Sequence, residues 1–143
     1  MTTLVLDASV AIKWAMPLAR EPLTDESLHL FRRYRDGEFD FAVPDMFWAE
    51  IGNVLWKGAR SGRWNRSDAE TTAEDFRARD FVTVSSFVLL PDALRIAFTY
   101  DRAVYDCLYV ALAVQLKSAL ITADEQLANA LAAYLPVKWL GSL

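Results

Sequence analysis

Short apolar runs typical of β-strands alternate along this chain with longer segments of helical periodicity. Five runs predict strands: TLVLD at 3–7, FAVP at 41–44, VTVSSF at 82–87, ALIT at 119–122 and VKWL at 137–140. Strands that alternate with helices are typical of an α/β fold, because parallel neighbours in a sheet need a long crossover connection between them. The sequence therefore predicts an α/β fold with a mostly parallel central sheet of four to five strands.

The segments between these strands have the signals of helices. We expect helices at 25–37, 46–62, 67–80, 91–99, 102–117 and 125–134, and one that begins near Val10. Ser67 with Glu70, and Thr122 with Glu125, fit the capping-box pattern at two helix starts. The 143 residues contain no repeat and no linker-like tract, so one domain over residues 1–143 is expected.

Composition excludes several classes of protein. A formal net charge of −4 does not suit a protein that coats nucleic acid, although it permits a nucleic-acid enzyme with an acidic site. Cys107 and His29 are the only residues of their types, which gives little support for a zinc site or a Cys/His nucleophile. The first residues lack the basic start of a signal peptide, and no apolar run reaches the roughly 20 residues of a membrane span. We therefore expect a cytoplasmic protein with no membrane partner.

One acid stands out in the apolar segment AVYDCLYVALAVQL at 103–116. Asp106 is the only charged residue of that segment. A buried carboxylate is costly unless it is paired. Asp106 is expected inside a helix and not at its end, so capping does not explain it. Two interpretations remain: a salt bridge to an Arg or Lys from another element, or a role as the ligand of a cation.

Three further acids have placements that suit a functional site. Asp7 ends the first strand and Asp124 follows the fourth, and the carboxyl ends of parallel strands are where functional groups gather. Glu50 lies in the apolar stripe of a predicted helix, one turn before Asn53, which could hydrogen-bond a neighbouring carboxylate. Each acid also has a structural interpretation. Asp7 or Ser9 can cap a helix, Glu50 can reach water, and Asp124 suits a helix first turn.

Convergence of the four acids would create an electrostatic conflict that a cation resolves. Like charges at close range raise one another's pKa values. Mg²⁺ prefers oxygen ligands and is commonly held by one or two carboxylates. Such an ion can bind a phosphate oxygen and activate water for attack on phosphorus. The pattern thus predicts a magnesium site with phosphodiester chemistry.

Four motifs in order resemble the PIN-domain ribonucleases, and above all the VapC-like toxins of bacterial type II toxin–antitoxin pairs. They are LVLDAS, AEIGNVL, YDCLYVALA and LITADEQLA, and the resemblance runs from residue 4 to about residue 140. It implies a PIN-like α/β/α sandwich and Mg²⁺- or Mn²⁺-dependent endoribonuclease activity. It also implies RNA as the substrate, a cognate antitoxin that blocks the site, and a homodimer.

The resemblance also implies roles for single residues. The family's acidic quartet matches Asp7, Glu50, Asp106 and Asp124. Asp7 and Asp106 would be the principal metal ligands, and the other two acids would assist, one of them orienting the attacking water. Thr122 matches a hydroxyl residue of the same pocket, and Ser9 is a second candidate. The fourth acid is the least regular position of the family, so Glu125 is the alternative to Asp124.

A basic segment follows the helix that carries Glu50. KGARSGRWNR, at 57–66, contains four cations and no acid: Lys57, Arg60, Arg63 and Arg66. These cations could steer RNA phosphates toward the metal, and Trp64 could stack on a base. They equally suit the C-terminus of a helix, where the dipole favours positive charge. Trp14, Trp48 and Trp56 are expected in the core or on a partner surface.

Other functions fit parts of the pattern. A phosphoacceptor receiver domain would use Asp45 as acceptor and Lys138 as its basic partner, but its first strand should end in an acidic pair and Asp106 would have no role. A phosphatase with an aspartyl nucleophile expects a second Asp where Ser9 stands. A catalytically inactive PIN-family binding module is opposed by the complete acidic set.

Overall fold

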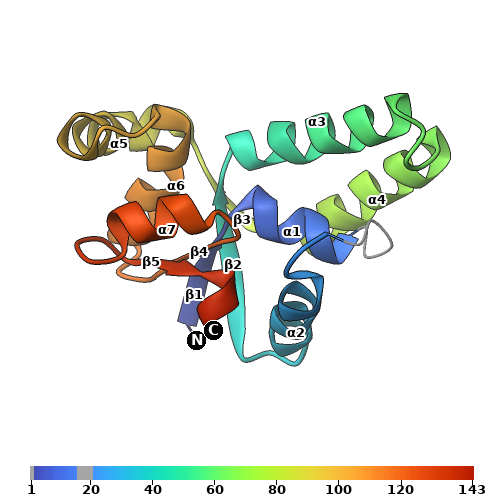
Figure 1. Ribbon diagram of the computed structural model, residues 1–143, viewed down its shortest axis with the longest axis horizontal. Helices are drawn as coiled ribbons and strands as arrows, with labels where there is room; N and C mark the ends of the chain where they lie inside the picture. The colour runs from blue at the N-terminus through green and yellow to red at the C-terminus, as the bar shows by residue number, and fades with distance from the viewer. Residues whose placement is uncertain (1, 16–20) are drawn as a thin grey trace.

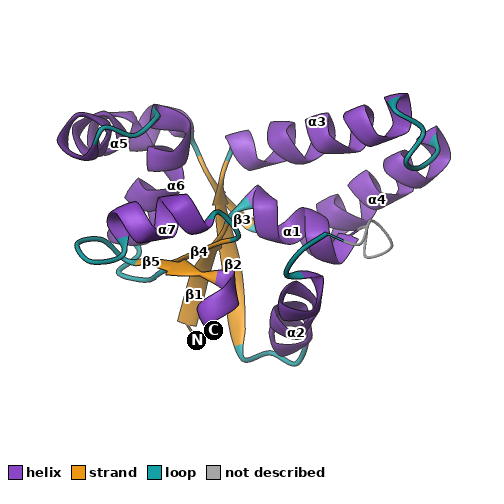
Figure 2. Ribbon diagram, in the orientation of Figure 1, coloured by secondary structure: helices purple, strands orange, loops and turns teal. Residues whose placement is uncertain are grey.

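The chain folds into one five-stranded sheet flanked by helices (Figures 1 and 2). The computed structural model describes residues 2–15 and 21–143. The strands are β1 (Thr2–Leu6), β2 (Phe39–Pro44), β3 (Val82–Val84), β4 (Leu120–Thr122) and β5 (Val137–Trp139). The helices are α1 (Ala8–Ala15), α2 (Thr24–Arg35), α3 (Met46–Arg60), α4 (Arg66–Arg79), α5 (Ser86–Tyr100), α6 (Val104–Gln115), α7 (Glu125–Leu131) and a short 3₁₀ helix, η2 (Leu140–Ser142).

The sheet confirms the predicted α/β fold. Its strand order is β3-β2-β1-β4-β5, and every pair of neighbouring strands is parallel. The chain builds outward from β1 to β2 and β3, and then returns to place β4 on the other side of β1. The order therefore reverses between β1 and β4, and the crevice beyond the carboxyl ends of these two strands is where such sheets bind ligands.

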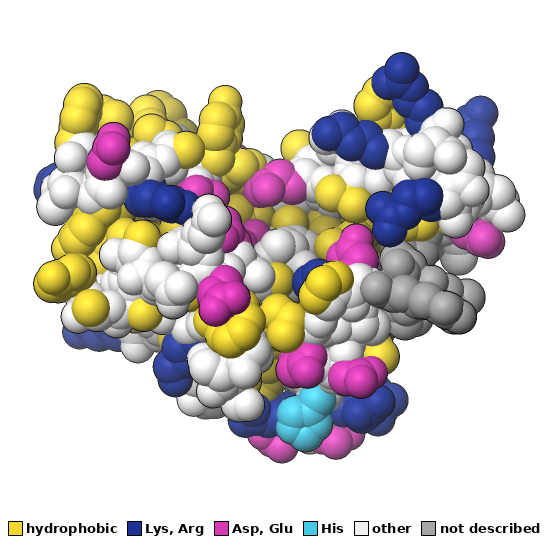
Figure 3. All heavy atoms as spheres, viewed as in Figure 1, with side chains coloured by type: hydrophobic (Ala, Val, Ile, Leu, Met, Phe, Trp, Pro, Cys, Tyr) yellow, Lys and Arg dark blue, Asp and Glu magenta, His cyan; other side chains and the backbone are white. Residues whose placement is uncertain are grey.

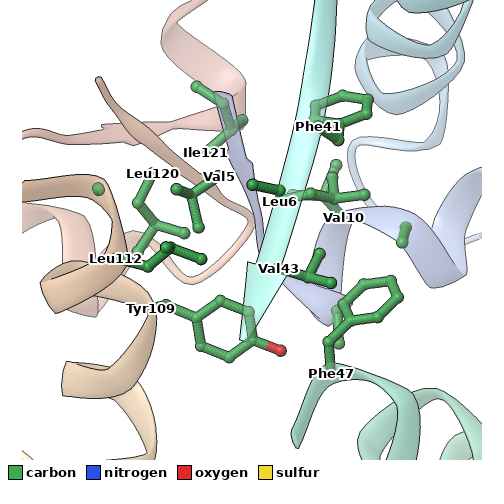
Figure 4. Close-up of a cluster of buried hydrophobic side chains, with 14 of the residues drawn as sticks. Val5, Leu6, Val10, Phe41, Val43, Phe47, Tyr109, Leu112, Leu120 and Ile121 are labelled. Atoms are coloured by element: carbon green, nitrogen blue, oxygen red, sulfur yellow. The ribbon is translucent and has the colours of Figure 1, made fainter. Parts of the chain in front are cut away.

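The core lies between the central strands and α6. Val5 and Leu120 are fully buried on the side of the sheet where Leu112 of α6 lies, whereas the buried Leu6 points to the other side, toward Val10 of α1 (Figure 4). Helix α6 contacts β1, β2 and β4 and is buried continuously from Cys107 to Ala113. This burial explains why its sequence is apolar on all sides, since a helix covered all round needs no polar face.

Several helix starts differ from the predictions, and local side-chain caps decide two of them, at α5 and α4. Ser85 accepts a hydrogen bond from the Phe87 backbone N–H at 3.1 Å, so α5 begins at residue 86 and not at 91. Asn65 accepts from the Asp68 backbone N–H at 2.7 Å, so it caps α4 in place of Ser67. Helix α6 has no side-chain cap. It begins at Val104 and not at 102, which puts Asp106 in its first turn.

The helices form two shoulders with a hollow between them. Helices α3 and α4 project on one side of the sheet, and α5 and α6 lie on the other (Figure 1). Acidic side chains gather at the floor of the hollow between these shoulders (Figure 3). In the part of the chain that the structure describes, no helix is long and apolar enough to cross a membrane.

Candidate active site

Asp7 and Thr122 join the ends of the two strands at which the strand order reverses. Thr122 is fully buried at the end of β4, and its hydroxyl donates to Asp7 Oδ2 at 2.7 Å. The Thr122 hydroxyl oxygen also accepts a hydrogen bond from the backbone N–H of Asp124 at 3.1 Å. Ser9 Oγ accepts the backbone N–H of Ala123 at 3.1 Å, while the Ser9 backbone N–H lies 3.4 Å from Asp7 Oδ1. Both predicted hydroxyl residues therefore lie beside Asp7.

Glu50 approaches the same region from α3 and is half-buried. Its Oε1 accepts a 2.7 Å hydrogen bond from the hydroxyl of Tyr109, which lies on α6. The sequence did not single out Tyr109, because an aromatic residue in an apolar segment is most simply a core residue. A signal existed, since Tyr109 follows Asp106 by three residues and so shares its face of the helix.

Asp106 is more exposed than predicted, and it has a basic partner. It is the third residue of α6, its side chain is 39% exposed, and its Oδ2 lies 3.7 Å from Arg102 Nη2. The expectation of a buried acid inside the helix was wrong, because α6 begins at Val104 and puts Asp106 in its first turn. Its basic neighbour does not come from another element, since Arg102 lies just before the same helix. This contact weighs against an explanation of Asp106 by cation binding alone. It is long and partly exposed, however, and such pairs contribute only about 0–1 kcal/mol.

Asp124 caps α7 and is exposed. Its Oδ1 accepts the Leu127 backbone N–H at 3.1 Å, so Asp124 is the capping residue and Thr122 is not. The predicted Thr122–Glu125 capping box was therefore wrong. Burial raises the pKa of Asp106, the charge of Arg102 lowers it, and the charge of Asp124 adds to the rise, so Asp124 lies within electrostatic reach of Asp106.

The electrostatics tie the acids together. Burial raises the pKa of Asp7, which the hydrogen bond from Thr122 partly offsets. Burial likewise raises the pKa of Glu50, and the charges of Asp7 and Asp106 add to the rise. The pKa of Tyr109 is raised by burial and by the neighbouring Asp7 and Glu50, so its hydroxyl stays protonated. Asp7, Glu50 and Asp106 are thus each harder to ionise because another acid lies nearby, which is the conflict that a cation would relieve.

The donor chemistry fits a hard divalent ion, while the spacing is open. Every side chain that could coordinate is a carboxylate or a hydroxyl, the oxygen donors that suit Mg²⁺ and Mn²⁺. Over residues 2–15 and 21–143, no three Asp, Glu, His or Cys side chains lie close enough together to hold one ion as they stand. The acids therefore face a common region without closing on a single point.

Two supporting predictions did not hold. Asn53 is exposed on α3, and its side chain makes no hydrogen bond to a carboxylate in the described part of the chain. Trp64 is half-buried, and Arg63 lies over its ring, 5.2 Å from the centroid, so the ring is already in contact with other residues. Its ring packs against Gly58, and its Nε1 donates to the Leu55 carbonyl at 2.8 Å, so it closes the turn between α3 and α4.

The four cations near that turn divide into two pairs. Arg63 lies 3.6 Å from Glu21, and Arg66 lies 2.7 Å from Glu70, so acids already neutralise these two. Arg60 lies over the exposed ring of Trp56, 5.2 Å from its centroid, and Lys57 is exposed beside it. Within the described ranges, no acid forms an ion pair with Lys57 or Arg60, which leaves them as the stronger candidates for phosphate contacts.

The three tryptophans that were expected in the core or on a partner surface differ in their burial. Trp14 and Trp48 are half-buried and pack in the aromatic core with Phe81, whereas Trp56 is 54% exposed.

The receiver-domain alternative loses its acceptor, because both carboxylate oxygens of Asp45 accept hydrogen bonds from Ser86. Those bonds lower the pKa of Asp45 and fasten the end of β2 to the start of α5.

Comparison with known proteins places the chain in a family. Residues 4–131 match the model of the PIN domain. The chain is 30% identical to Ribonuclease VapC3 of Pyrobaculum aerophilum over 131 residues, which cover 88% of this chain and 92% of that protein.

Solved structures share the fold. PAE2754 from Pyrobaculum aerophilum superposes with a TM-score of 0.72 at 22% identity, over 99% of this chain and 85% of that one. A toxin–antitoxin complex from Klebsiella pneumoniae gives 0.65 at 15% identity, over 94% and 95% of the two chains. VapBC2 from Rickettsia felis, bound to a DNA fragment from its promoter, gives 0.66 at 11% identity, over 96% and 98%. With a sheet that reverses at Asp7 and acids grouped beyond it, the chain belongs to the PIN-domain family and is VapC-like within it.

Proposed function

We propose that this chain is a metal-dependent endoribonuclease that acts in the cytoplasm as the toxin of a toxin–antitoxin pair. The observation that carries the proposal is the placement of Asp7. Thr122 holds it at the strand-order reversal, and Glu50 and Asp106 approach from two different helices. Burial raises the pKa of all three acids. Membership of the PIN-domain family and the likeness to a protein named as a ribonuclease support it.

The residues would divide the work of hydrolysis among them. A bound Mg²⁺ or Mn²⁺ ion would supply Lewis acidity and an activated water. Asp7 and Asp106 would bind that ion, and Thr122 would hold Asp7 in place. Glu50 would add its negative charge to the metal site, orient the attacking water and accept its proton, with Tyr109 holding one carboxylate oxygen. Asp124 would add negative charge at the rim of the site.

RNA would approach over the hollow beside α3. Lys57 and Arg60 lie on the last turns of the helix that also carries Glu50. Phosphate contacts from such cations give affinity without sequence preference. We therefore assign these two residues to RNA binding, ahead of Arg63 and Arg66, which already have acidic partners.

Two protein partners belong to the proposal. An antitoxin that covers the acidic hollow is supported by the structural neighbours described as toxin–antitoxin assemblies.

A homodimer is supported by the outer face of α5. Four apolar side chains recur there at helical spacing and are exposed: Phe87, Leu90, Leu94 and Phe98. We call these residues the α5 stripe. Asp92 and Arg95 pair with each other on the same helix at 2.9 Å, so the apolar stripe itself is the surface that a second copy would cover.

Cleavage of total RNA tests the enzymatic proposal. The wild type should degrade RNA with Mg²⁺ and stop when EDTA is added. Asp7→Asn should be inactive although it folds, because an amide oxygen can still accept the hydrogen bond of Thr122. Cleavage that survives EDTA, or an active Asp7→Asn variant, would contradict the mechanism. If the protein binds RNA but does not cleave it with any divalent ion that is added, it is an inactive binding module.

A further inference from the structure

Tyr109 is a buried polar residue in contact with the acidic site. Its side chain is only 3% exposed. Its ring extends from α6 toward Phe47 of α3, with the hydroxyl at the end nearest α3 (Figure 4). There the hydroxyl meets Glu50 Oε1 at 2.7 Å. One phenol thus connects the two helices that bring Glu50 and Asp106 to the hollow.

The direction of this hydrogen bond is fixed. The Tyr109 hydroxyl donates and Glu50 Oε1 accepts, because an ionised carboxylate has no proton to give. Burial and the nearby carboxylates raise the pKa of Tyr109, which keeps the proton on the phenol. Tyr109 therefore acts as a permanent donor to Glu50 and cannot turn away without leaving a buried polar group unpaired.

Glu50 depends on this contact more than Asp7 depends on any one partner. Asp7 has a short side chain and receives contacts from Thr122 and from Ser9. Glu50 has one more rotatable bond, and across the described residues its carboxylate has a single hydrogen-bond donor, Tyr109. Without the phenol, nothing in that part of the chain would select one orientation of this carboxylate.

We propose that Tyr109 is a positioning residue, whose hydroxyl holds the Glu50 carboxylate turned toward Asp7 and Asp106. The inference rests on the proposed metal-dependent function and assigns to it a residue beyond the acids and their hydroxyl neighbours. Groups that orient metal-site carboxylates typically change metal affinity or activity by about 10–100-fold when they are removed. The phenol should contribute in this range.

The test compares Mn²⁺ affinity in four proteins, read from the loss of the free-ion signal in electron paramagnetic resonance. The proteins are wild type, Tyr109→Phe, Glu50→Ala and the double variant. Tyr109→Phe should bind Mn²⁺ about 10-fold more weakly than the wild type. In the Glu50→Ala background, measured at millimolar Mn²⁺, the same change should have no further effect. An equal loss in both backgrounds would overturn the proposal, because it would mean a general effect of the ring. So would unchanged affinity in Tyr109→Phe.

A second measurement separates positioning from folding. In RNA cleavage, Tyr109→Phe should lower kcat about 10-fold with KM unchanged, because RNA contacts lie elsewhere. Tyr134→Phe, which removes an exposed hydroxyl on the loop after α7, is the matched control and should behave as the wild type. A wild type that binds Mn²⁺ without cleaving RNA would contradict the proposed function, while the affinity comparison would still decide the role of Tyr109. A wild type that binds no Mn²⁺ would contradict both.

Discussion

The hydroxyl of Thr122 lies 2.7 Å from Asp7 Oδ2 and links the ends of two neighbouring parallel strands. The same hydroxyl accepts the backbone N–H of Asp124, so one buried oxygen organises two acids. The position of the site and the placement of these two acids thus depend on the pairing of β1 with β4.

Replacement of Thr122 by Val should damage both stability and activity. The change leaves the Asp7 carboxylate and the Asp124 N–H without their shared partner, which costs about 1–3 kcal/mol. Metal affinity should fall about 10-fold or more. Thr122→Ser keeps the hydroxyl and is the control. Chemical denaturation and Mn²⁺ titration would report the two effects, and a Val variant equal to the Ser variant in both would contradict this role.

The metal-free protein should become less stable as the pH rises toward neutrality. The pKa of Asp7 is raised by burial above its ordinary value of 3.8, and the pKa values of Glu50 and Asp106 are raised as well. Between the ordinary and the raised pKa values, the folded state holds more protons than the unfolded chain. The free energy of unfolding therefore falls as pH increases through that window.

Thermal unfolding in EDTA would measure this dependence. The melting temperature of the wild type should fall as the pH rises through the window between the ordinary and the raised pKa values of these acids. Asp7→Asn should lose less, because it lacks one of the acids that must ionise. At neutral pH the variant should melt higher than the wild type, and added Mg²⁺ should reverse the order. An equal fall in melting temperature for the two proteins would contradict this account, because it would show that ionisation of Asp7 does not destabilise the folded state.

Two glycines of α3 should respond to Ala in opposite directions. A Cβ at Gly58 would overlap the Trp64 ring, which also donates to the Leu55 carbonyl. Gly58→Ala should therefore destabilise the protein by about 1–3 kcal/mol, as overpacking does. Gly52→Ala meets nothing within 4 Å and should stabilise it by about 0.5–1 kcal/mol through helix propensity. Urea denaturation of both variants provides the comparison, and similar shifts would contradict the packing of Trp64.

The α5 stripe should hold two copies of the chain together. Phe87 and Phe98 are 88% and 82% exposed, so charged replacements cost the isolated chain little. The wild type should sediment as a dimer, and the Phe87→Glu/Phe98→Glu variant as a monomer with an unchanged circular dichroism spectrum. Val82→Glu, on an exposed position of β3, is the control and should remain dimeric. A monomeric wild type at tens of micromolar, or a dimeric double variant, would refute this interface.

The parts of the site that follow from strand order could be predicted from the sequence. Asp7 and Thr122 end strands that pair in parallel, so their proximity follows once both strands are recognised. The i,i+4 spacing of Arg102 and Asp106 could have indicated their contact, but the exposure of Asp106 could not be predicted, because it depends on a helix start that moves by two residues. Element boundaries are set by local caps such as Asn65, which compete closely with neighbours such as Ser67.

Tyr109 illustrates a different limit. A tyrosine in an apolar helix indicates burial, and Tyr109 is buried, but the partner of its hydroxyl comes from α3, 59 residues away in sequence. Only the packing of α6 against the sheet decides which buried hydroxyl meets which acid. The same holds for Trp64, whose role depends on the space left by Gly58.

The chemistry of the RNA ends tests the central claim most directly. Water activated at a metal site attacks phosphorus and leaves a linear phosphate on one product and a hydroxyl on the other. A labelled RNA cleaved by the wild type with Mg²⁺ should therefore give linear phosphate ends, and EDTA or Asp7→Asn should abolish the products. Ends that carry a 2′,3′-cyclic phosphate, or the same products in EDTA, would contradict hydrolysis by the acids around Asp7.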